Sequence, residues 1–114
     1  MTAQITVKGI VGINPELKEF QSSKKARFTV ASSTTVKGQP VTTWFNAEAW
    51  NGDTELIMER IAKGQLVEVT GKLRLNLYRS QKHNKQMIDA TIAIESFRIL
   101  PREQQGSLVQ ELTA

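Results

Sequence analysis

The longest regular pattern in this 114-residue chain is a strict alternation of apolar and polar side chains over residues 67–78. One set consists of Val67, Val69, Gly71, Leu73, Leu75 and Leu77, and the other of Glu68, Thr70, Lys72, Arg74, Asn76 and Tyr78. Successive side chains of a β-strand point to opposite faces, so this period of two predicts a long strand with one apolar face. Such a strand must pair with others in a sheet that buries that face.

Shorter alternations surround this strand. They predict strands over residues 5–11, 25–30 and 42–50, with turns at 12–15 and 21–24 and a hairpin loop at 36–40. Between residues 51 and 64 the period becomes helical, and we expect Asp53 as the N-cap and Gly64 just beyond the C-cap. A loop over residues 79–86 leads to a last strand over 88–99, with a bulge before Phe97.

The predicted order is therefore three strands, one helix and two strands. This is the order of the OB-fold, an all-β, five-stranded barrel with one short helix between strands three and four. A chain of 114 residues is long enough for one such domain. We expect the domain to span residues 1–100, and residues 101–114 to form a short, mobile tail.

Composition limits the kinds of function. Fifteen Lys and Arg against eleven Asp and Glu give a net charge of +4, which favours polyanionic partners such as nucleic acids. The chain has no cysteine and a single histidine, His83, so we expect no disulfide, no metal site and no cofactor. No nucleophile, base and orienting group occur together, so we expect no enzyme. Without an apolar stretch of membrane length, the sequence predicts a cytoplasmic protein with no membrane contact.

The two tryptophans of the chain, Trp44 and Trp50, are six residues apart in a predicted strand and therefore share a face. Asn46 and Glu48 lie on the same face, whereas the set suited to the core is Phe45, Ala47 and Ala49. Indoles exposed on a basic domain favour the stacking of nucleic-acid bases. The alternatives are that the helix or the tail packs over the rings, or that they contact another subunit.

Three segments carry motifs in a characteristic order. They are Gly12-Ile13-Asn14-Pro15-Glu16-Leu17, then Thr43-Trp44 with Trp50-Asn51, and then Ala62-Lys63-Gly64 leading into Gly71-Lys72-Leu73-Arg74. Together they resemble the bacterial single-stranded DNA-binding protein family over about residues 5–100. The resemblance implies an OB domain that binds single-stranded DNA with little sequence preference, in replication, recombination and repair. It also implies a homo-oligomer, a tetramer or alternatively a dimer, located at the nucleoid.

The resemblance assigns base stacking to three aromatic residues and phosphate contact to two basic residues. These are Trp44, Trp50 and Tyr78, and Lys63 and Arg74. Charge patterning adds Lys72, which shares a strand face with Arg74 and Tyr78, and the further cations Lys8, Arg27, Lys82 and Lys85. Glu48 and Glu68 belong to the same outward sets and repel phosphate, so we expect the DNA to pass beside them.

The chain departs from the family's pattern in three places. Residues 32–37 lack an aromatic, Asn76 stands where a second basic residue is common, and the tail has no acidic, Phe-terminated tip. The first two departures favour weaker DNA binding, and the third puts recruitment of replication and repair proteins in question. The missing tip and the missing aromatic favour one alternative, a tail-less scaffold protein of the primosomal kind. A second alternative is a binder of single-stranded RNA, because stacking and backbone charge do not by themselves read the 2′-hydroxyl.

Overall fold

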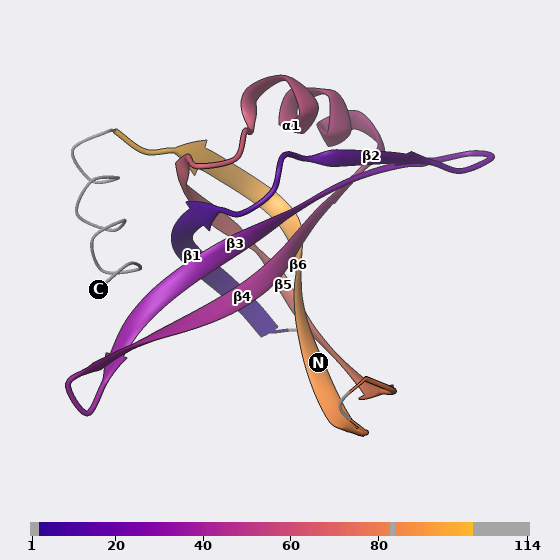
Figure 1. The fold of residues 1–114 in the computed structure, drawn as a ribbon. Helices are drawn as coiled ribbons and strands as arrows, with labels where there is room; N and C mark the ends of the chain where they lie inside the picture. The colour runs from indigo at the N-terminus through magenta and orange to yellow at the C-terminus, as the bar shows by residue number, and fades with distance from the viewer. Residues whose placement is uncertain (1–2, 83, 102–114) are drawn as a thin grey trace.

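The computed structural model describes residues 3–82 and 84–101, which form a barrel with a short helix at one end (Figure 1). The strands are β1 (Ala3–Val11), β2 (Glu16–Glu19), β3 (Lys24–Val36), β4 (Gln39–Trp50), β5 (Leu66–Ser80) and β6 (Lys85–Ile99). Between β4 and β5 lie a 3-10 turn, η1 (Asn51–Asp53), and the helix α1 (Thr54–Arg60). The predicted OB-type, all-β architecture is confirmed. The predicted tail, apart from Pro101, and His83 lie outside the described residues.

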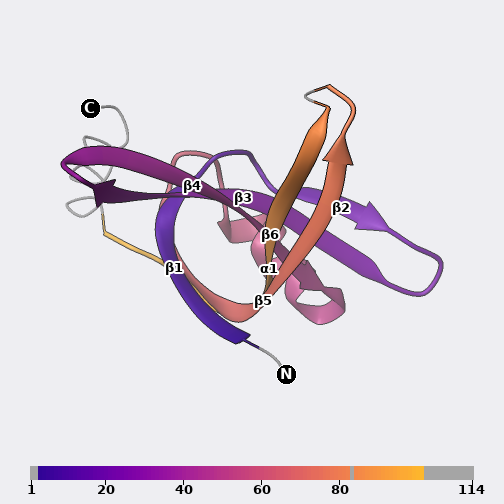
Figure 2. The ribbon, with the colours of Figure 1, turned by 90° about the horizontal axis from the view of Figure 1, so that it is seen from below.

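One sheet closes on itself to form the barrel. Its strand order is β1-β5-β6-β4-β3-β2, and an additional pairing of β1 with β3 closes the ring. That closing pair joins Ile10 to Ala31 and Val11 to Val30, and the ring is seen from below in Figure 2. Neighbouring strands are antiparallel except β4 and β6, which pair in parallel over residues 46–48 of β4.

The predicted count of five strands is too low by one. The additional strand is β2, whose sequence Glu-Leu-Lys-Glu is too short and too polar to show an alternation. All four of its residues are exposed, and the segment is held by backbone pairing with β3, where Leu17 lies opposite Ala26. A neighbouring strand, and not burial of its own side chains, therefore makes this segment extended.

The core of the barrel is built from the inward side chains of the strands, which alternate with outward ones as predicted. The helix α1 adds Ile57, which is fully buried, and Ile61 follows it into the core. The buried strand residues of this cluster are Val7, Val11, Ala26, Phe28, Val30, Ala47, Ala49, Val67, Val69 and Ile92. Phe45 packs against the cluster, so the assignment of Phe45, Ala47 and Ala49 to the inward face is correct.

Both predicted hairpin loops are longer than the turns in the structure. β3 and β4 are joined by Lys37 and Gly38 alone, whose φ angles are +52° and +78°. Positive φ at both central positions belongs to the two-residue turn whose twist matches the flanking strands. β5 likewise continues to Ser80, which pairs with Lys85 at the start of β6, so the loop is confined to 81–84. Polar residues extend these strands because the ladder uses backbone hydrogen bonds.

The helix is shorter than the predicted segment: its N-cap position is the predicted one, and its C-terminal end differs. Asp53 occupies the N-cap position, but its side chain makes no capping hydrogen bond; the Thr54 hydroxyl instead donates to the carbonyl of Asn51, at 2.6 Å. The helix ends at Arg60, well before Gly64, so Gly64 is not the residue after the C-cap. Gly64 has φ +93° and donates its N–H to the carbonyl of Val11, at 2.9 Å, which ties this turn to the end of β1.

A bulge in β6 lies where the sequence predicts it, before Phe97. Thr70 of β5 pairs with Ser96, whereas the next residue, Gly71, pairs with Ile94, so Glu95 is the extra residue. A side chain at Gly71 would collide with the backbone carbonyl of Ala93. Glycine at this position therefore allows β5 and β6 to approach closely beside the bulge.

Two hairpins, β3–β4 and β5–β6, extend beyond the barrel and diverge (Figure 1). Within the described residues, the pairing of β1 with β5 ends at Leu73. Beyond that point the apolar set continues along the β5–β6 hairpin without a covering element, and Leu75, Leu77 and Ile88 are 60%, 64% and 62% exposed. The alternation thus predicts the strand correctly, but it does not reveal where the barrel stops covering it.

Candidate nucleic-acid interface

Strand register places the two tryptophans on the side of the sheet that points away from the core, which we call the outward face. Residues directly opposite each other on paired strands share a face. Trp50 lies opposite Lys25, Glu48 opposite Arg27, Asn46 opposite Thr29, and Trp44 opposite Ala31. The aromatic rings of β4 and the cations of β3 therefore lie on the same surface.

The cations of β5 belong to the same surface, with β6 between them and β4. Lys72 lies opposite Ala93 and Arg74 opposite Thr91, and these two small β6 residues pair in turn with β4. Because both β6 side chains are short, Arg74 spans the strand, and its Nη2 lies 3.3 Å from Oε2 of Glu48. Small side chains thus separate the tryptophan-bearing strand from the β5 cations.

Trp44 is seated against a glycine at the end of β1. Its side chain is among the most exposed apolar groups of the protein, at 58%. A Cβ atom at Gly12 would stand 2.5 Å from Cζ3 of Trp44 and 2.7 Å from Oγ1 of Thr29. A hollow of about 280 Å³ adjoins the ring, lined by Ile10, Gly12, Ala31, Thr42 and Trp44. The indole therefore packs against the backbone at Gly12, and the hollow leaves space beside the edge of the ring.

Trp50 lies in a more crowded environment. Its ring stacks on Phe20, which stands just beyond β2, with 5.8 Å between ring centroids and 26° between planes. The ammonium group of Lys25 lies 5.7 Å from the ring centroid, within the range of a cation–π contact. The indole is 44% exposed, so part of its surface is still accessible.

The carboxylates that the sequence places on this surface are paired with cations. Glu48 is only 12% exposed; its Oε1 lies 3.5 Å from Lys25 Nζ, and its Oε2 contacts Arg74. Glu68 accepts two hydrogen bonds from Arg98, at 3.0 and 3.3 Å. Both negative charges are therefore compensated locally, which reduces the repulsion of phosphate expected from sequence.

The remaining predicted residues are distributed over the molecule. The backbone N–H of Lys63 donates to Oδ1 of Asn14, at 2.9 Å, so Lys63 stands beside the segment that contains Gly12. Arg27 donates to Oδ1 of Asn46, at 2.9 Å, within the outward face. Lys8 lies on β1 opposite Glu68, beside the Glu68–Arg98 pair.

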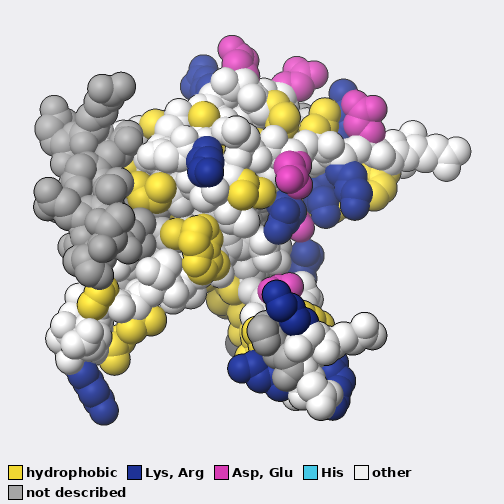
Figure 3. Space-filling view, in the orientation of Figure 1, with side chains coloured by type: hydrophobic (Ala, Val, Ile, Leu, Met, Phe, Trp, Pro, Cys, Tyr) yellow, Lys and Arg dark blue, Asp and Glu magenta, His cyan; other side chains and the backbone are white. Residues whose placement is uncertain are grey.

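Tyr78 lies away from the barrel, on the β5–β6 hairpin. It is exposed, on the outward side of β5, and lies opposite Met87. Lys82 and Lys85 are at the tip of the same hairpin. The space-filling view shows the surface hollowed between this hairpin and the β3–β4 hairpin (Figure 3). Tyr78, Lys82 and Lys85 thus form a group separate from the tryptophans.

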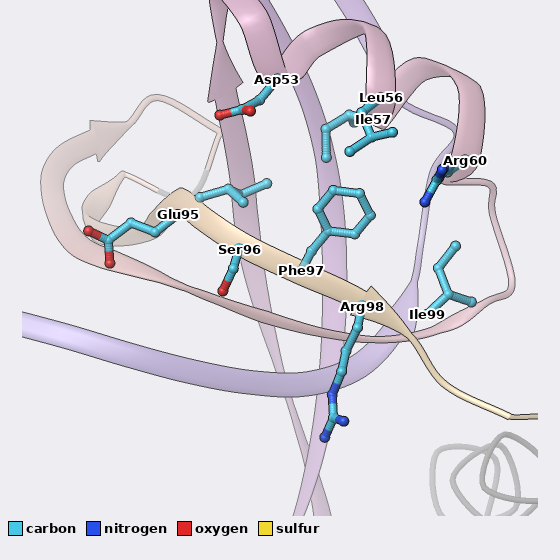
Figure 4. A pocket seen from close by; sticks show the side chains of 10 residues that line it. Asp53, Leu56, Ile57, Arg60, Glu95, Ser96, Phe97, Arg98 and Ile99 are labelled. Carbon is cyan, nitrogen blue, oxygen red and sulfur yellow. The ribbon is translucent and has the colours of Figure 1, made fainter.

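A second hollow, of about 470 Å³, lies between α1 and the end of β6. Figure 4 shows Phe97 directed toward Leu56 and Ile57 of α1, with Arg60 and Ile99 at one end. The hollow continues the core beneath the helix and contains none of the predicted site residues.

Among residues 3–82 and 84–101, no group of three or more His, Cys, Asp or Glu is placed to hold a metal ion. No described helix is long and apolar enough to cross a membrane.

Comparison with protein families gives a match that covers the whole barrel. The model of the single-strand binding protein family matches residues 2–100. This chain belongs to the single-strand binding protein family. The match includes all of the outward face and both diverging hairpins.

Curated relatives of this family member are named single-stranded DNA-binding proteins. A single-stranded DNA-binding protein 1 from Nostoc sp. is 28% identical over 101 residues, covering 88% of this chain and 84% of that protein. The single-stranded DNA-binding protein of Thermosynechococcus vestitus is 31% identical over 94 residues, covering 81% and 77%. A crystal structure of the small single-stranded DNA-binding protein from Streptomyces coelicolor superposes with a TM-score of 0.73 at 17% identity, covering 90% of this chain and 98% of that one. The structural likeness supports the fold.

Two residues of the tryptophan environments are missing from the prediction for this family member. Gly12 appears in the sequence analysis as part of a turn and of a motif but not as a site residue, and its support of Trp44 depends on a contact between the segment after β1 and β4. Phe20 lies in a segment without alternation, and its contact with Trp50 depends on the unpredicted strand β2. An aromatic residue in the otherwise polar segment 18–25 is the one sequence signal that points to Phe20.

Proposed function

We propose that this protein binds single-stranded DNA without sequence preference and protects it during replication, recombination or repair. The observation that carries the proposal is the outward face, where exposed indoles and a set of cations occur together on a member of this family. Bases stack on Trp44 and Trp50, and on Tyr78 where the strand reaches the β5–β6 hairpin. Relatives named single-stranded DNA-binding proteins support the choice of ligand.

The mechanism combines two physical terms. Stacking of one base on an aromatic side chain contributes on the order of 1–3 kcal/mol and tolerates any sequence, because every base has a π face. Phosphate contacts come from Arg27, Lys63, Lys72 and Arg74, with Lys8, Lys82 and Lys85 at the periphery. These contacts release counterions, so affinity falls as salt rises. Duplex DNA binds poorly because its bases are already stacked on each other.

The proposal includes a homo-oligomer, a tetramer or alternatively a dimer, and no catalytic activity. One OB domain covers only a few nucleotides, on the order of 4–16. Several linked copies bind one strand more tightly because each later contact is intramolecular. A location in the cytoplasm, at the nucleoid, follows from the ligand.

The test is a titration of the intrinsic tryptophan fluorescence with oligo(dT), at low and high salt, beside a duplex of the same length. We expect strong quenching by oligo(dT), weaker quenching at high salt, and little quenching by duplex. Absence of quenching by oligo(dT) in low salt would contradict stacking on the tryptophans. Competition with a matched oligo(U) strand distinguishes DNA from the alternative ligand, single-stranded RNA, since the 2′-hydroxyl is the group that differs.

A second candidate function, that of a scaffold for a protein partner, is favoured by one observation. Leu75, Leu77 and Ile88 expose an apolar face on the β5–β6 hairpin, and contiguous apolar surface of this kind marks contact sites. Substituting Leu77 by Ser removes the most exposed of these side chains. Unchanged oligomers in light scattering would leave this face for another protein, as the scaffold function requires, whereas a loss of oligomers would assign it to contact between copies of this chain.

A further inference from the structure

The unpredicted strand β2 carries side chains on the outward face. Lys18 of β2 lies directly opposite Lys25 of β3, so both point outward. Phe20 is two residues further along the same face, where its backbone N–H donates to the carbonyl of Ser23, at 2.7 Å, and closes the turn. The outward face therefore extends beyond β3 to the edge of the sheet.

Phe20 is an aromatic residue that is exposed to solvent and does not belong to the core of the barrel. Its side chain is 47% exposed at the tip of the β2–β3 hairpin. A hollow of about 510 Å³ lies beside the turn, bounded by residues 19–24 and by 51, 52, 54 and 55, so the helix does not cover the ring. The exposed part of the phenyl group is apolar surface that a stacked ligand can cover.

The contact between Phe20 and Trp50 joins the two rings into one apolar surface. With centroids 5.8 Å apart and planes inclined by 26°, the rings touch each other directly. A base therefore does not fit between them. It can lie on the free surface of the pair, which is wider than that of one indole alone.

Two lysines belong to the same face as this aromatic pair: the ammonium of Lys25 lies 5.7 Å from the Trp50 ring centroid, and Lys18 is the residue opposite Lys25 on β2. Lysines directly opposite each other on neighbouring strands repel, and the arrangement destabilises the hairpin in the absence of an anion. Glu48 compensates Lys25 from one side, at 3.5 Å, but Lys18 stands on the far side of Lys25, on the edge strand. A phosphate group is a ligand that would relieve this repulsion and at the same time belong to a base stacked nearby.

We propose that Phe20, Trp50, Lys18 and Lys25 form a subsite for one nucleotide at the end of the single-stranded track. The base stacks on the Phe20–Trp50 pair, and the phosphate contacts the two lysines. This inference rests on the proposed function and deepens it, because it extends the bound strand to the β2–β3 hairpin. In the contrasting case Phe20 only shields Trp50 from water and has no ligand of its own.

Binding of a labelled oligo(dT) and the number of nucleotides occluded on poly(dT) test the subsite in four variants of the full chain. Phe20→Ala removes one ring of the pair and should weaken binding by roughly 5-fold, the lower end of the loss for one stacked base, because Trp50 still offers a ring. Phe20→Leu keeps an apolar cover on Trp50 but has no π face, and should be nearly as weak. Phe20→Tyr keeps the ring and should bind like the wild type. Gln21→Ala, in the same turn, is the matched control.

The outcomes separate this inference from the proposed function. Loss of affinity in Phe20→Ala and Phe20→Leu, with about one nucleotide fewer occluded and an unchanged salt slope, supports the subsite. Tighter or equal binding by Phe20→Ala, or wild-type binding by Phe20→Leu, would show that the ring only covers Trp50 and would overturn it. If the wild type itself does not bind oligo(dT), the proposed function fails first.

The lysine contribution has its own readout. Lys18→Gln removes one phosphate contact, so the slope of log affinity against log salt should become shallower by about 0.7. An unchanged slope would remove Lys18 from the subsite. Circular dichroism melting of each variant verifies that the barrel is folded at the temperature of the binding measurement.

Discussion

Trp44 and Trp50 have the same side chain, strand and face, yet the structure supports them in opposite ways. Trp44 is held by the absence of a side chain, since its ring lies where a Cβ atom of Gly12 would be. Trp50 is held by the presence of one, the ring of Phe20. Trp44 is the more exposed of the two, at 58% against 44%. Equal positions in a strand pattern therefore do not give equal binding surfaces.

The difference has a physical basis in how each ring loses its freedom. A side chain that is already fixed loses less conformational entropy when a ligand binds. At Trp44 the backbone at Gly12, just after β1, fixes the ring and leaves an adjacent hollow open. At Trp50 the ring of Phe20 covers part of the indole, and this ring is itself an aromatic surface on which a base can stack. We therefore expect DNA binding to depend more strongly on Trp44 alone, and on Trp50 only together with Phe20.

The largest loss of oligo(dT) affinity should come from removing one indole at a time, and the loss should be larger for Trp44 than for Trp50. Trp44→Ala should weaken oligo(dT) binding by about 10- to 100-fold, because one open stacking surface is lost. Trp50→Ala should weaken it several-fold less, because Phe20 still offers a ring beside the vacated position. Fluorescence anisotropy with a labelled oligo(dT) measures both. Equal losses in the two variants would show that the environments do not differ in function.

The next largest effect concerns the glycine beneath Trp44. Gly12→Ala places a methyl group 2.5 Å from the indole, so the exposed ring must move, while the unfolding free energy should change by only about 0.5 kcal/mol, as for other surface substitutions. Oligo(dT) binding should weaken by about 5- to 10-fold through the displaced ring.

The matched control for this change is Gly52→Ala, because a Cβ atom at Gly52 meets nothing within 4 Å. In thermal melting and in fluorescence anisotropy, the Gly52→Ala variant should behave like the wild type. If both glycine variants bind equally well, Gly12 does not position Trp44 for binding.

The sequence predicts the fold well where one face of a strand is buried. Alternation identifies the strand that ends at Trp50, and the core set Phe45, Ala47 and Ala49 follows from it. It does not identify β2, because a strand that buries none of its own side chains leaves no period-two signal. It also overestimates both hairpin loops, because backbone pairing continues through polar residues such as Ser80 and Lys85.

The candidate site is predictable at the level of single strands and not at the level of contacts between them. That Trp44 and Trp50 share a face is a local property of one strand. The support of Trp44 by Gly12 and the stacking of Phe20 on Trp50 join residues about thirty positions apart, so they depend on the closure of the barrel. The pairing of Glu48 with Arg74 has the same origin, since it crosses β6.

A smaller effect should come from Glu48, whose carboxylate lies between Lys25, beside Trp50, and Arg74 of β5. Glu48 pairs with Lys25 near Trp50 and with Arg74 on β5, and Glu48→Gln releases both cations. Oligo(dT) should bind a few-fold more tightly at low salt, and the salt slope should steepen by up to about 1.4, or about 0.7 for each new phosphate contact. Titrations at several salt concentrations measure the slope. Weaker binding would instead mean that Glu48 orients the two cations for phosphate.

The smallest effect is expected for Glu68→Gln, which changes the net charge as Glu48→Gln does but at a site beside neither tryptophan. Glu68 pairs with Arg98, whose side chain is 67% exposed, and an exposed pair of this kind contributes about 0–1 kcal/mol to stability. If the region around the tryptophans is what binds DNA, releasing Arg98 should change oligo(dT) affinity by less than about two-fold, because screening weakens charges beyond about 10 Å at 0.1 M salt. Because both variants gain the same charge, overall attraction of the strand is equal, and any difference between their salt slopes reports position alone. Equal steepening in both would mean that the β1–β5 side of the barrel, where Lys8 lies opposite Glu68, belongs to the main path of the DNA and not to its periphery, and that the contrast between Trp44 and Trp50 describes only part of that path.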